Sequence, residues 1–384
     1  MTTAPLTPQQ RRLGLTAAYA CVFGTTVALG LTLPLLPLAI ERDGHSAFFN
    51  GLNGTAGGLA LLLTAPFVPA LAARFGAINL LLASFALAAI CLALFPYTSV
   101  WAWFPLRFVL NAALQSLFVV SEVWINTLAT ERTRGRLIGL YGALATGGFA
   151  AGPALAAQFP EGSAIPFWLG AAAILIGLVP VLAARALAPV IEHASLRGIA
   201  AVLAIAAVPI VAALVHALSE TSVTSFLPVF AVRQGWEQAD ALLLITAFGL
   251  GNVLLQIPIG WLADKVDRIR LLGLCAAFGC LGGLILPMAA NDPILLTILA
   301  FFWGGAIIGI YTIGLTLVGQ VFQGAALAPA SAAFAFAYAL GSILGPGSAG
   351  FSMDLAGDNA LGWFIASICL GYAILAFTRP ARLT

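Results

Sequence analysis

The sequence predicts an all-α membrane protein with twelve transmembrane helices in two pseudo-symmetric six-helix bundles. Composition is the first reason: 61% of the 384 residues are hydrophobic and 8% are charged, whereas soluble domains carry about 25% charged residues. The second reason is that apolar runs of membrane-spanning length recur along the chain. The third is that the two halves of the chain share residues at a fixed offset.

Twelve apolar runs lie between polar or Pro/Gly-containing breaks, and each reaches the roughly 20 residues that cross a bilayer core. The runs of the first half are 13–38, 50–73, 77–96, 100–129, 137–159 and 164–184, and those of the second half are 199–232, 239–263, 271–290, 293–319, 327–353 and 359–378. The first run exceeds the roughly 7–15 apolar residues of a signal peptide, so we interpret it as a membrane span. The predicted organisation is an N-terminal bundle at 1–184, a cytoplasmic linker at 185–197 and a C-terminal bundle at 198–384.

The basic residues predict the orientation of these spans. An even number of spans places both termini on one side, and that side carries most of the 16 basic residues. They are Arg11, Arg12, Arg74, Arg132, Arg134, Arg136, Arg185, Arg197, Lys265, Arg268, Arg270, Arg379 and Arg382. The opposite side carries Arg42 and Arg233, and Arg107 lies within a span. Because basic loops stay in the cytoplasm, we expect both termini to be cytoplasmic.

An internal repeat relates the two halves at an offset of 191 residues. Pro37 then corresponds to Pro228, and the loop at 69–76 corresponds to the loop at 260–267. With two more residues of offset, the fifth span matches the eleventh through Gly148, Gly152 and Pro153 against Gly341, Gly345 and Pro346. Two copies of six spans have the same topology, so the repeat predicts parallel bundles. The glycines permit close helix approach and each proline bends its helix, which serves either simple packing or rocking of the halves.

The loop between the eighth and ninth spans carries a recognisable motif. It reads Gly260-Trp-Leu-Ala-Asp264-Lys265-Val-Asp267-Arg268-Ile-Arg270. This resembles the Gly-x-x-x-Asp-Arg/Lys-x-Gly-Arg-Arg/Lys cytoplasmic motif of the major facilitator superfamily, from which it departs at Asp267. The element from Gly148 to Pro153 resembles that of the family's proton-coupled drug antiporters.

Two further elements fit the same resemblance. Arg107 loosely matches the family's arginine in the fourth span, and Glu122 followed by Arg134 is similar to the junction between the fourth and fifth spans of many members. The resemblance implies a bacterial inner-membrane transporter that works by alternating access and needs no cofactor. The loop residues Asp264, Lys265 and Arg268, together with Glu122 and Arg134, would then form a cytoplasmic gate. The alternative is that the loop charges only set the orientation of the spans under the positive-inside rule.

The fourth span carries a polar stripe. Arg107, Asn111, Gln115, Glu122 and Asn126 fall within a sector about 100° wide around its helix axis. Ionisable groups inside a membrane are costly and are functional candidates by default, so the stripe predicts a water-filled substrate or proton pathway. The alternative is a stripe packed against another helix. For Glu122, near the cytoplasmic end, a simpler expectation is a contact with one of the following arginines, Arg132, Arg134 or Arg136.

The seventh span carries His216 and Glu220, which four-residue spacing places on one helix face. An imidazole beside a carboxylate can share or relay a proton, which favours a proton-coupling site. The alternative is a buried polar pair that holds this span against a neighbour. Asn252 and Gln256 in the eighth span have the same spacing and are further candidates for lining the pathway.

These features predict a secondary transporter that moves a small solute, with proton-coupled export of an apolar or amphipathic compound as the first interpretation and proton-coupled uptake of a metabolite as the alternative. A remote alternative is an intramembrane enzyme that uses His216 and Glu220. No Gly-x-x-x-x-Gly-Lys-Ser/Thr motif exists in the sequence, which excludes a P-loop ATPase. Five cysteines and three histidines without clustering predict no metal site, and the net charge of +2 argues against nucleic acid. We expect the protein to be a monomer in the lipid bilayer.

Overall fold

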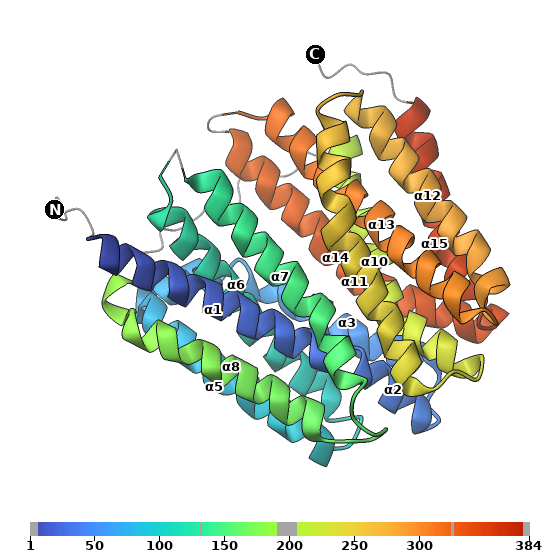
Figure 1. Cartoon of the computed structure of the whole chain (residues 1–384), viewed down its shortest axis with the longest axis horizontal. Helices are drawn as coiled ribbons and strands as arrows, with labels where there is room; N and C mark the ends of the chain where they lie inside the picture. The colour runs from blue at the N-terminus through green and yellow to red at the C-terminus, as the bar shows by residue number, and fades with distance from the viewer. Residues whose placement is uncertain (1–6, 131–132, 190–205, 324–325, 379–384) are drawn as a thin grey trace. The chain divides into compact units, whose positions relative to one another are not determined.

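The computed structural model describes residues 7–130, 133–189, 206–323 and 326–378. Within these ranges every regular element is a helix (Figure 1). Eleven of these helices are long and apolar enough to cross a membrane, and a bent pair supplies a twelfth if it is counted as one span. The predicted all-α membrane fold is therefore confirmed. Arg132, Arg197, Arg379, Arg382 and the parts of the predicted linker and seventh span at 190–205 lie outside the described residues.

The chain divides into two compact units. Unit 1 comprises Met1–Thr32 and Leu63–Ala194, and unit 2 comprises Leu33–Leu62 and Ser195–Thr384. Unit 2 thus includes a segment from the first half of the sequence. The bundle boundaries expected from the sequence (1–184 and 198–384) remain a prediction about the transmembrane architecture.

In unit 1, α1 is the central helix. It packs against α6, α7 and α8, while α5 packs against α6 and α8, and Figure 1 shows α1 between α7 and α8. The elements of this unit are α1 (Pro8–Thr32), α4 (Val68–Phe75), α5 (Ala77–Leu94), the short η1 (Phe95–Tyr97), α6 (Trp103–Leu128), α7 (Arg134–Ala156), α8 (Ile165–Ala183) and η2 (Arg185–Leu187).

In unit 2, α10 takes the position that α1 takes in unit 1. It packs against α13, α14 and α15, while α12 packs against α13 and α15. The helices are α2 (Leu35–Arg42), α3 (Ala47–Thr64, of which the last two residues fall in unit 1), α10 (Ala207–Arg233), α11 (Gln238–Ala263), α12 (Arg268–Ala289), α13 (Pro293–Val321), α14 (Leu327–Ala356) and α15 (Ala360–Thr378). The same pattern of neighbours in both units is the structural counterpart of the sequence repeat.

Small residues explain how these helices approach so closely. A Cβ atom added at Gly152 of α7 would collide with the backbone of Gly30 in α1. At the corresponding place in unit 2, a Cβ at Gly345 of α14 would lie 2.7 Å from the carbonyl oxygen of Leu218 in α10. Without a hydrophobic driving force between helices in lipid, such backbone-to-backbone contacts supply much of the packing energy.

The first two predicted spans each comprise two helices, with a proline between them. The run at 13–38 is divided into α1 and α2, with Pro34 between them. The run at 50–73 is divided into α3 and α4, which are bent by 58°, and Pro66 lies in the break. Proline lacks the backbone N–H and clashes with the preceding turn, which favours a break at these two positions, whereas Pro153 and Pro346 are accommodated inside α7 and α14.

Candidate functional site

Helix α10 of unit 2 carries a pair of ionisable side chains, of which one is buried and the other half-buried. His216 is 2% exposed and the Glu220 side chain is 23% exposed, and His216 Nε2 lies 3.2 Å from Glu220 Oε2. One helical turn separates the two residues, so their side chains lie one above the other on the same face. The structure therefore brings this predicted pair into direct contact.

The hydrogen bonds of His216 determine where its protons lie. Its Nδ1 is 2.9 Å from the carbonyl oxygen of Ile307 in α13. A carbonyl oxygen only accepts, so Nδ1 carries a hydrogen. Nε2 and Glu220 Oε2 then need one proton between them, because without it two lone pairs would face each other. This geometry accommodates one proton in the contact, either as imidazolium with carboxylate or as imidazole with carboxylic acid.

Two tyrosines complete the surroundings of this pair. Tyr338 of α14 donates its hydroxyl hydrogen to Glu220 Oε2 at 3.1 Å. The ring of Tyr311 in α13 lies 5.0 Å from the imidazole ring between centroids, and that of Tyr338 lies 5.9 Å away. Three helices therefore converge on one carboxylate oxygen and one imidazole.

Packing fixes this geometry. A Cβ at Gly341 would lie 2.5 Å from the carbonyl oxygen of Leu214, so glycine there lets α14 approach α10 near Tyr338. Tyr311 and Tyr338 also pack against a hydrophobic cluster of buried residues, namely Ala206, Ile210, Ala213, Val318, Phe322, Ala330, Ala333, Phe334 and Ala337. Low-dielectric surroundings strengthen each polar interaction in the pair and make an unpaired polar group there costly.

The polar stripe of the fourth span lies on α6 in unit 1. Arg107 is buried at 6% exposure, and Asn111 Nδ2 donates to the Arg107 carbonyl oxygen at 2.8 Å. Gln115 is half-buried and Glu122 is exposed. Asn126 repeats the local pattern, since its Nδ2 donates to the Glu122 carbonyl oxygen at 2.9 Å. Both asparagines thus satisfy part of their polar groups on their own helix.

Asn252 and Gln256 of α11 lie against α13. Gln256 Nε2 donates to Thr312 Oγ1 at 3.1 Å. Asn252 is 7% exposed, its Oδ1 has no hydrogen-bond partner, and a Cβ at Gly304 would lie 3.1 Å from that oxygen. Both amide side chains therefore lie at the contact between α11 and α13.

Charged side chains in and beside the loop between α11 and α12 make contacts within the loop and with the adjacent helix ends. Arg268 Nη2 lies 2.9 Å from Asp264 Oδ1, and Arg268 Nε donates to the Ala263 carbonyl oxygen at 2.9 Å. Asp267 accepts from the backbone nitrogen of Arg270 and thereby caps α12. Lys265 lies 3.5 Å from the centroid of the Trp261 ring. Asp267, which departs from the family motif, therefore acts as a helix cap.

The expected contact of Glu122 with the neighbouring arginines has no counterpart in the described part of the loop. No ion pair joins Glu122 to Arg134 or Arg136 there, and Arg132 lies outside the described residues. In the same described ranges, no group of three or more His, Cys, Asp or Glu side chains is placed to hold a metal ion.

The glycines of the fifth and eleventh spans contact corresponding helices. A Cβ at Gly148 would collide with Thr26 Oγ1 of α1, as one at Gly152 would with Gly30. Gly341 and Gly345 contact α10 in the same way. Pro153 and Pro346 lie inside α7 and α14, respectively.

Two features were not predicted from the sequence. Tyr338 donates its hydroxyl hydrogen to Glu220. Glu41, Arg233 and Asp358 form a charged cluster. The sequence did carry an indication of this cluster. Arg233 is one of only two basic residues expected on its side of the membrane, and several acidic residues are expected on the same side.

Comparisons with known proteins agree on one family. A sequence model of the Major Facilitator Superfamily matches residues 18–206 and 209–384. The MFS-type transporter YfkF of Bacillus subtilis (strain 168) is 26% identical over 345 residues, which cover 88% of each chain. The MFS-type transporter YcaD of Escherichia fergusonii is 28% identical over 376 residues, which cover 96% of this chain and 94% of the relative.

Two solved structures share the fold. The nucleoside transporter NupG superposes with a TM-score of 0.79 at 14% identity and covers 96% of this chain and 99% of its own. A D-xylose–proton symporter superposes with a TM-score of 0.73 at 15% identity and covers 97% and 98%, respectively. Identity at this level shows a common fold and says nothing about the solute.

Proposed function

Since this chain belongs to the major facilitator superfamily, we propose that it is a proton-coupled secondary transporter that moves a small solute by alternating access. The observation that carries the proposal is the His216–Glu220 contact, with 3.2 Å between Nε2 and Oε2. This contact requires one proton, and a carboxylate that binds and releases a proton inside a membrane is what coupling needs.

Release of the proton has a structural consequence. With Nδ1 committed to the Ile307 carbonyl, loss of the shared proton leaves Nε2 and Glu220 Oε2 as two acceptors in contact. Glu220 must then turn away from His216 or find another donor, and Tyr338 of α14 is the donor already in place. The protonation state of the pair is thereby linked to the contact between α10 and α14, which is the kind of two-state element that coupling requires.

We propose export of an apolar or amphipathic compound as the direction of transport. The few charged residues of the chain and the antiporter-like element from Gly148 to Pro153 support this direction. Uptake of a small anionic metabolite is the second candidate, because the buried guanidinium of Arg107 suits an anionic group. In both cases the proposed orientation has cytoplasmic termini, as the distribution of basic residues indicates.

The remaining candidates have supporting roles in this proposal. Arg107, Asn111 and Gln115 of α6 and Asn252 and Gln256 of α11 contribute polar groups to the solute or proton pathway. Charges at the cytoplasmic ends form a gate, which comprises Glu122, Arg134, Asp264, Lys265 and Arg268. The glycine–proline elements set the contacts on which the helices of each unit rock, and they comprise Gly148, Gly152, Pro153, Gly341, Gly345 and Pro346.

Reconstitution into proteoliposomes tests the proposed function. With a pH gradient imposed and candidate solutes screened, we expect solute flux that follows the proton gradient in sign and stops when a protonophore collapses it. Export predicts that proton and solute move in opposite directions, and uptake predicts that they move together. Solute flux that ignores both the gradient and the protonophore would contradict proton coupling.

Arg107→Ala should weaken binding of the transported solute. We expect the half-saturating concentration to rise by roughly tenfold or more, corresponding to about 1.4 kcal/mol of binding free energy. Arg185→Ala is the matched control, because Arg185 is an exposed arginine of unit 1 and its loss should leave the half-saturating concentration unchanged. If Arg107→Ala has unaltered affinity for every solute transported, Arg107 has no part in binding.

A further inference from the structure

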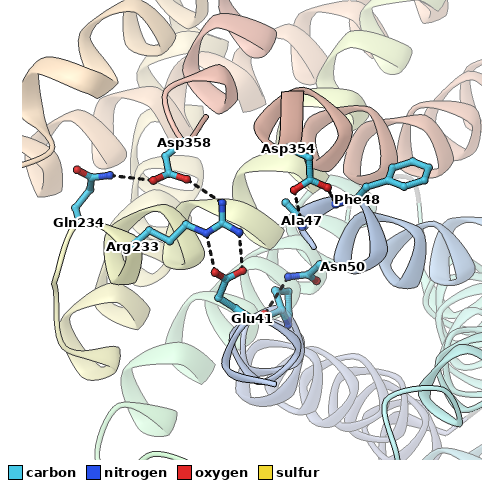
Figure 2. A network of polar contacts seen from close by, with 9 residues as sticks. Glu41, Ala47, Phe48, Asn50, Arg233, Gln234, Asp354 and Asp358 are labelled. Atoms are coloured by element: carbon cyan, nitrogen blue, oxygen red, sulfur yellow. Dashed lines mark hydrogen bonds and ion pairs between the residues drawn. The ribbon is translucent and has the colours of Figure 1, made fainter. Parts of the chain in front are cut away.

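A charged cluster in unit 2 joins α2, α10 and the turn between α14 and α15 (Figure 2). Arg233, the last residue of α10, donates from Nε to Glu41 Oε1 at 2.7 Å and from Nη2 to Glu41 Oε2 at 2.8 Å. Its Nη1 donates to Asp358 Oδ1 at 2.8 Å. We call Glu41, Arg233 and Asp358 the Arg233 clasp. A planar guanidinium that grips one carboxylate with two hydrogen bonds combines strength with a defined geometry.

A second carboxylate fastens the start of α3. Asp354, near the end of α14, accepts from the backbone nitrogen of Ala47 at 2.9 Å with Oδ1 and from that of Phe48 at 2.8 Å with Oδ2. The first backbone N–H groups of a helix have no partner within it, and the helix dipole favours an anion there. We call this contact the Asp354 cap; Figure 2 shows it beside the clasp.

Between the Asp354 cap and the middle of α3, helices α3 and α14 contact each other through backbone atoms. A Cβ at Gly51 would collide with the Pro346 carbonyl oxygen, and one at Gly58 would lie 2.7 Å from the Ser342 carbonyl oxygen. Seven-residue spacing puts both glycines on one face. Thr55 Oγ1 also donates to the Ile343 carbonyl oxygen at 2.8 Å. A segment from the first half of the sequence thus lies closely on a helix from the second half.

We propose that the Arg233 clasp and the Asp354 cap form a latch that holds the segment 35–62 against α10 and α14 in one conformation and releases it in another. The latch rests on the proposed function in that alternating access requires such a release. In the proposed orientation the latch would lie at the outer end of unit 2, at the end of α10 and the turn between α14 and α15.

The exposure of the clasp makes it suited to opening. The side chains of Arg233, Glu41 and Asp358 are 23%, 21% and 30% exposed. Separating a fully buried pair would leave uncompensated charge in a low dielectric, whereas these groups regain water as they part. Opening the clasp therefore requires a modest free energy, while the hydrogen bonds of Arg233 still favour the closed state.

The clasp also predicts a graded response to substitution. Removing Arg233 breaks all three bonds and leaves the carboxylates of Glu41 and Asp358 to repel each other. Glu41→Gln removes the charge and one of the two acceptor oxygens that Arg233 uses on that residue, and Asp358→Asn removes a charge but keeps an acceptor oxygen for its one bond. The latch should accordingly loosen in the order Arg233→Gln, then Glu41→Gln, then Asp358→Asn.

A cysteine under α3 can report the opening. Ser225 of α10 is 8% exposed, and a Cβ at Gly54 of α3 would lie 3.9 Å from its Oγ. Ser225→Cys changes little in size, and the five native cysteines are all buried. The experiment measures the labelling rate of full-length Ser225→Cys protein in lipid nanodiscs by a soluble charged maleimide, with the protein lacking this substitution as background.

Arg233→Gln should raise the labelling rate roughly 5- to 50-fold, the range of typical conformational coupling, with smaller increases for Glu41→Gln and Asp358→Asn. Asp240→Asn is the matched control, because Asp240 is an exposed acid in the first turn of α11 outside the latch, and should leave the rate unchanged. Raising salt from about 0.05 M to about 0.5 M should speed labelling when the clasp is intact and have no effect in Arg233→Gln.

A labelling rate that Arg233→Gln does not change, or a salt effect that persists in this variant, would overturn the latch. If Arg233→Gln does not yield folded protein, two other measurements replace it: the labelling rate of Glu41→Gln and the salt dependence of labelling with the clasp intact. If neither Glu41→Gln nor added salt raises the labelling rate, the latch is likewise overturned. No solute or proton gradient is present in this measurement. A negative result therefore contradicts the latch and leaves the transport proposal standing.

Discussion

Glu220→Gln is expected to reduce accumulation of solute driven by a pH gradient to the level of liposomes without protein. Glutamine has the shape of protonated glutamate, and its amide N–H can donate to His216 Nε2 while Nδ1 keeps its bond to the Ile307 carbonyl. The contact therefore survives, but it no longer holds a proton that can leave. The variant should remain in the arrangement of the protonated pair.

Two measurements on Glu220→Gln have different expected outcomes. Exchange of solute across the membrane without a gradient does not require net proton release, so we expect counterflow to persist in Glu220→Gln. Proton-driven accumulation should disappear. Glu237→Gln is the matched control, since Glu237 is exposed at the start of α11 and its side chain makes no cap there. Accumulation by Glu220→Gln with unchanged proton dependence would show that coupling resides elsewhere.

Gly152→Ala is expected to destabilise the protein by about 1–3 kcal/mol, the usual range for overpacking. The added Cβ would collide with the backbone of Gly30 and Leu31, and would lie 2.5 Å from Gly30 Cα. Backbone atoms cannot rotate away as a side chain can, so α1 and α7 must separate. Thermal unfolding of the purified protein in detergent should show a midpoint several degrees lower.

The same helix offers the control for this prediction. A Cβ at Gly142 of α7 would meet no atom within 4 Å. Alanine favours a helix over glycine by roughly 1 kcal/mol, so Gly142→Ala should leave the midpoint unchanged or raise it. Equal midpoints for the two variants would mean that the close approach of α1 and α7 contributes nothing to stability.

The membrane fold was predictable because lipid imposes a simple rule on the sequence. Backbone polar groups cannot be left unpaired in hydrocarbon, so apolar runs of sufficient length become helices. Pro34 and Pro66 alone did not predict the breaks in the first two spans, because proline disfavours a helix locally and yet Pro153 and Pro346 lie inside continuous helices. The meeting of His216 with Glu220 was predictable, because residues four apart on a helix are neighbours.

Partners from distant parts of the chain could not be predicted in this way. Tyr338 reaches Glu220 across 118 residues, and Arg233 reaches Glu41 across 192. Neither spacing contains information about which helix faces which. Asn252 and Gln256 illustrate the same difficulty, because their spacing predicts a shared face but not that α13 lies against it.

By itself, the sequence determined that this protein is a helical membrane protein built from a repeated six-span unit, because solvent and helical periodicity act on each segment locally. Tertiary structure decided which groups from distant segments meet: Tyr338 and the Ile307 carbonyl beside the His216–Glu220 pair, and Glu41 and Asp358 around Arg233. The reason is physical. Such contacts depend on how closely backbones approach at glycines such as Gly341 and Gly51, and that distance is a property of packed helices rather than of any one segment.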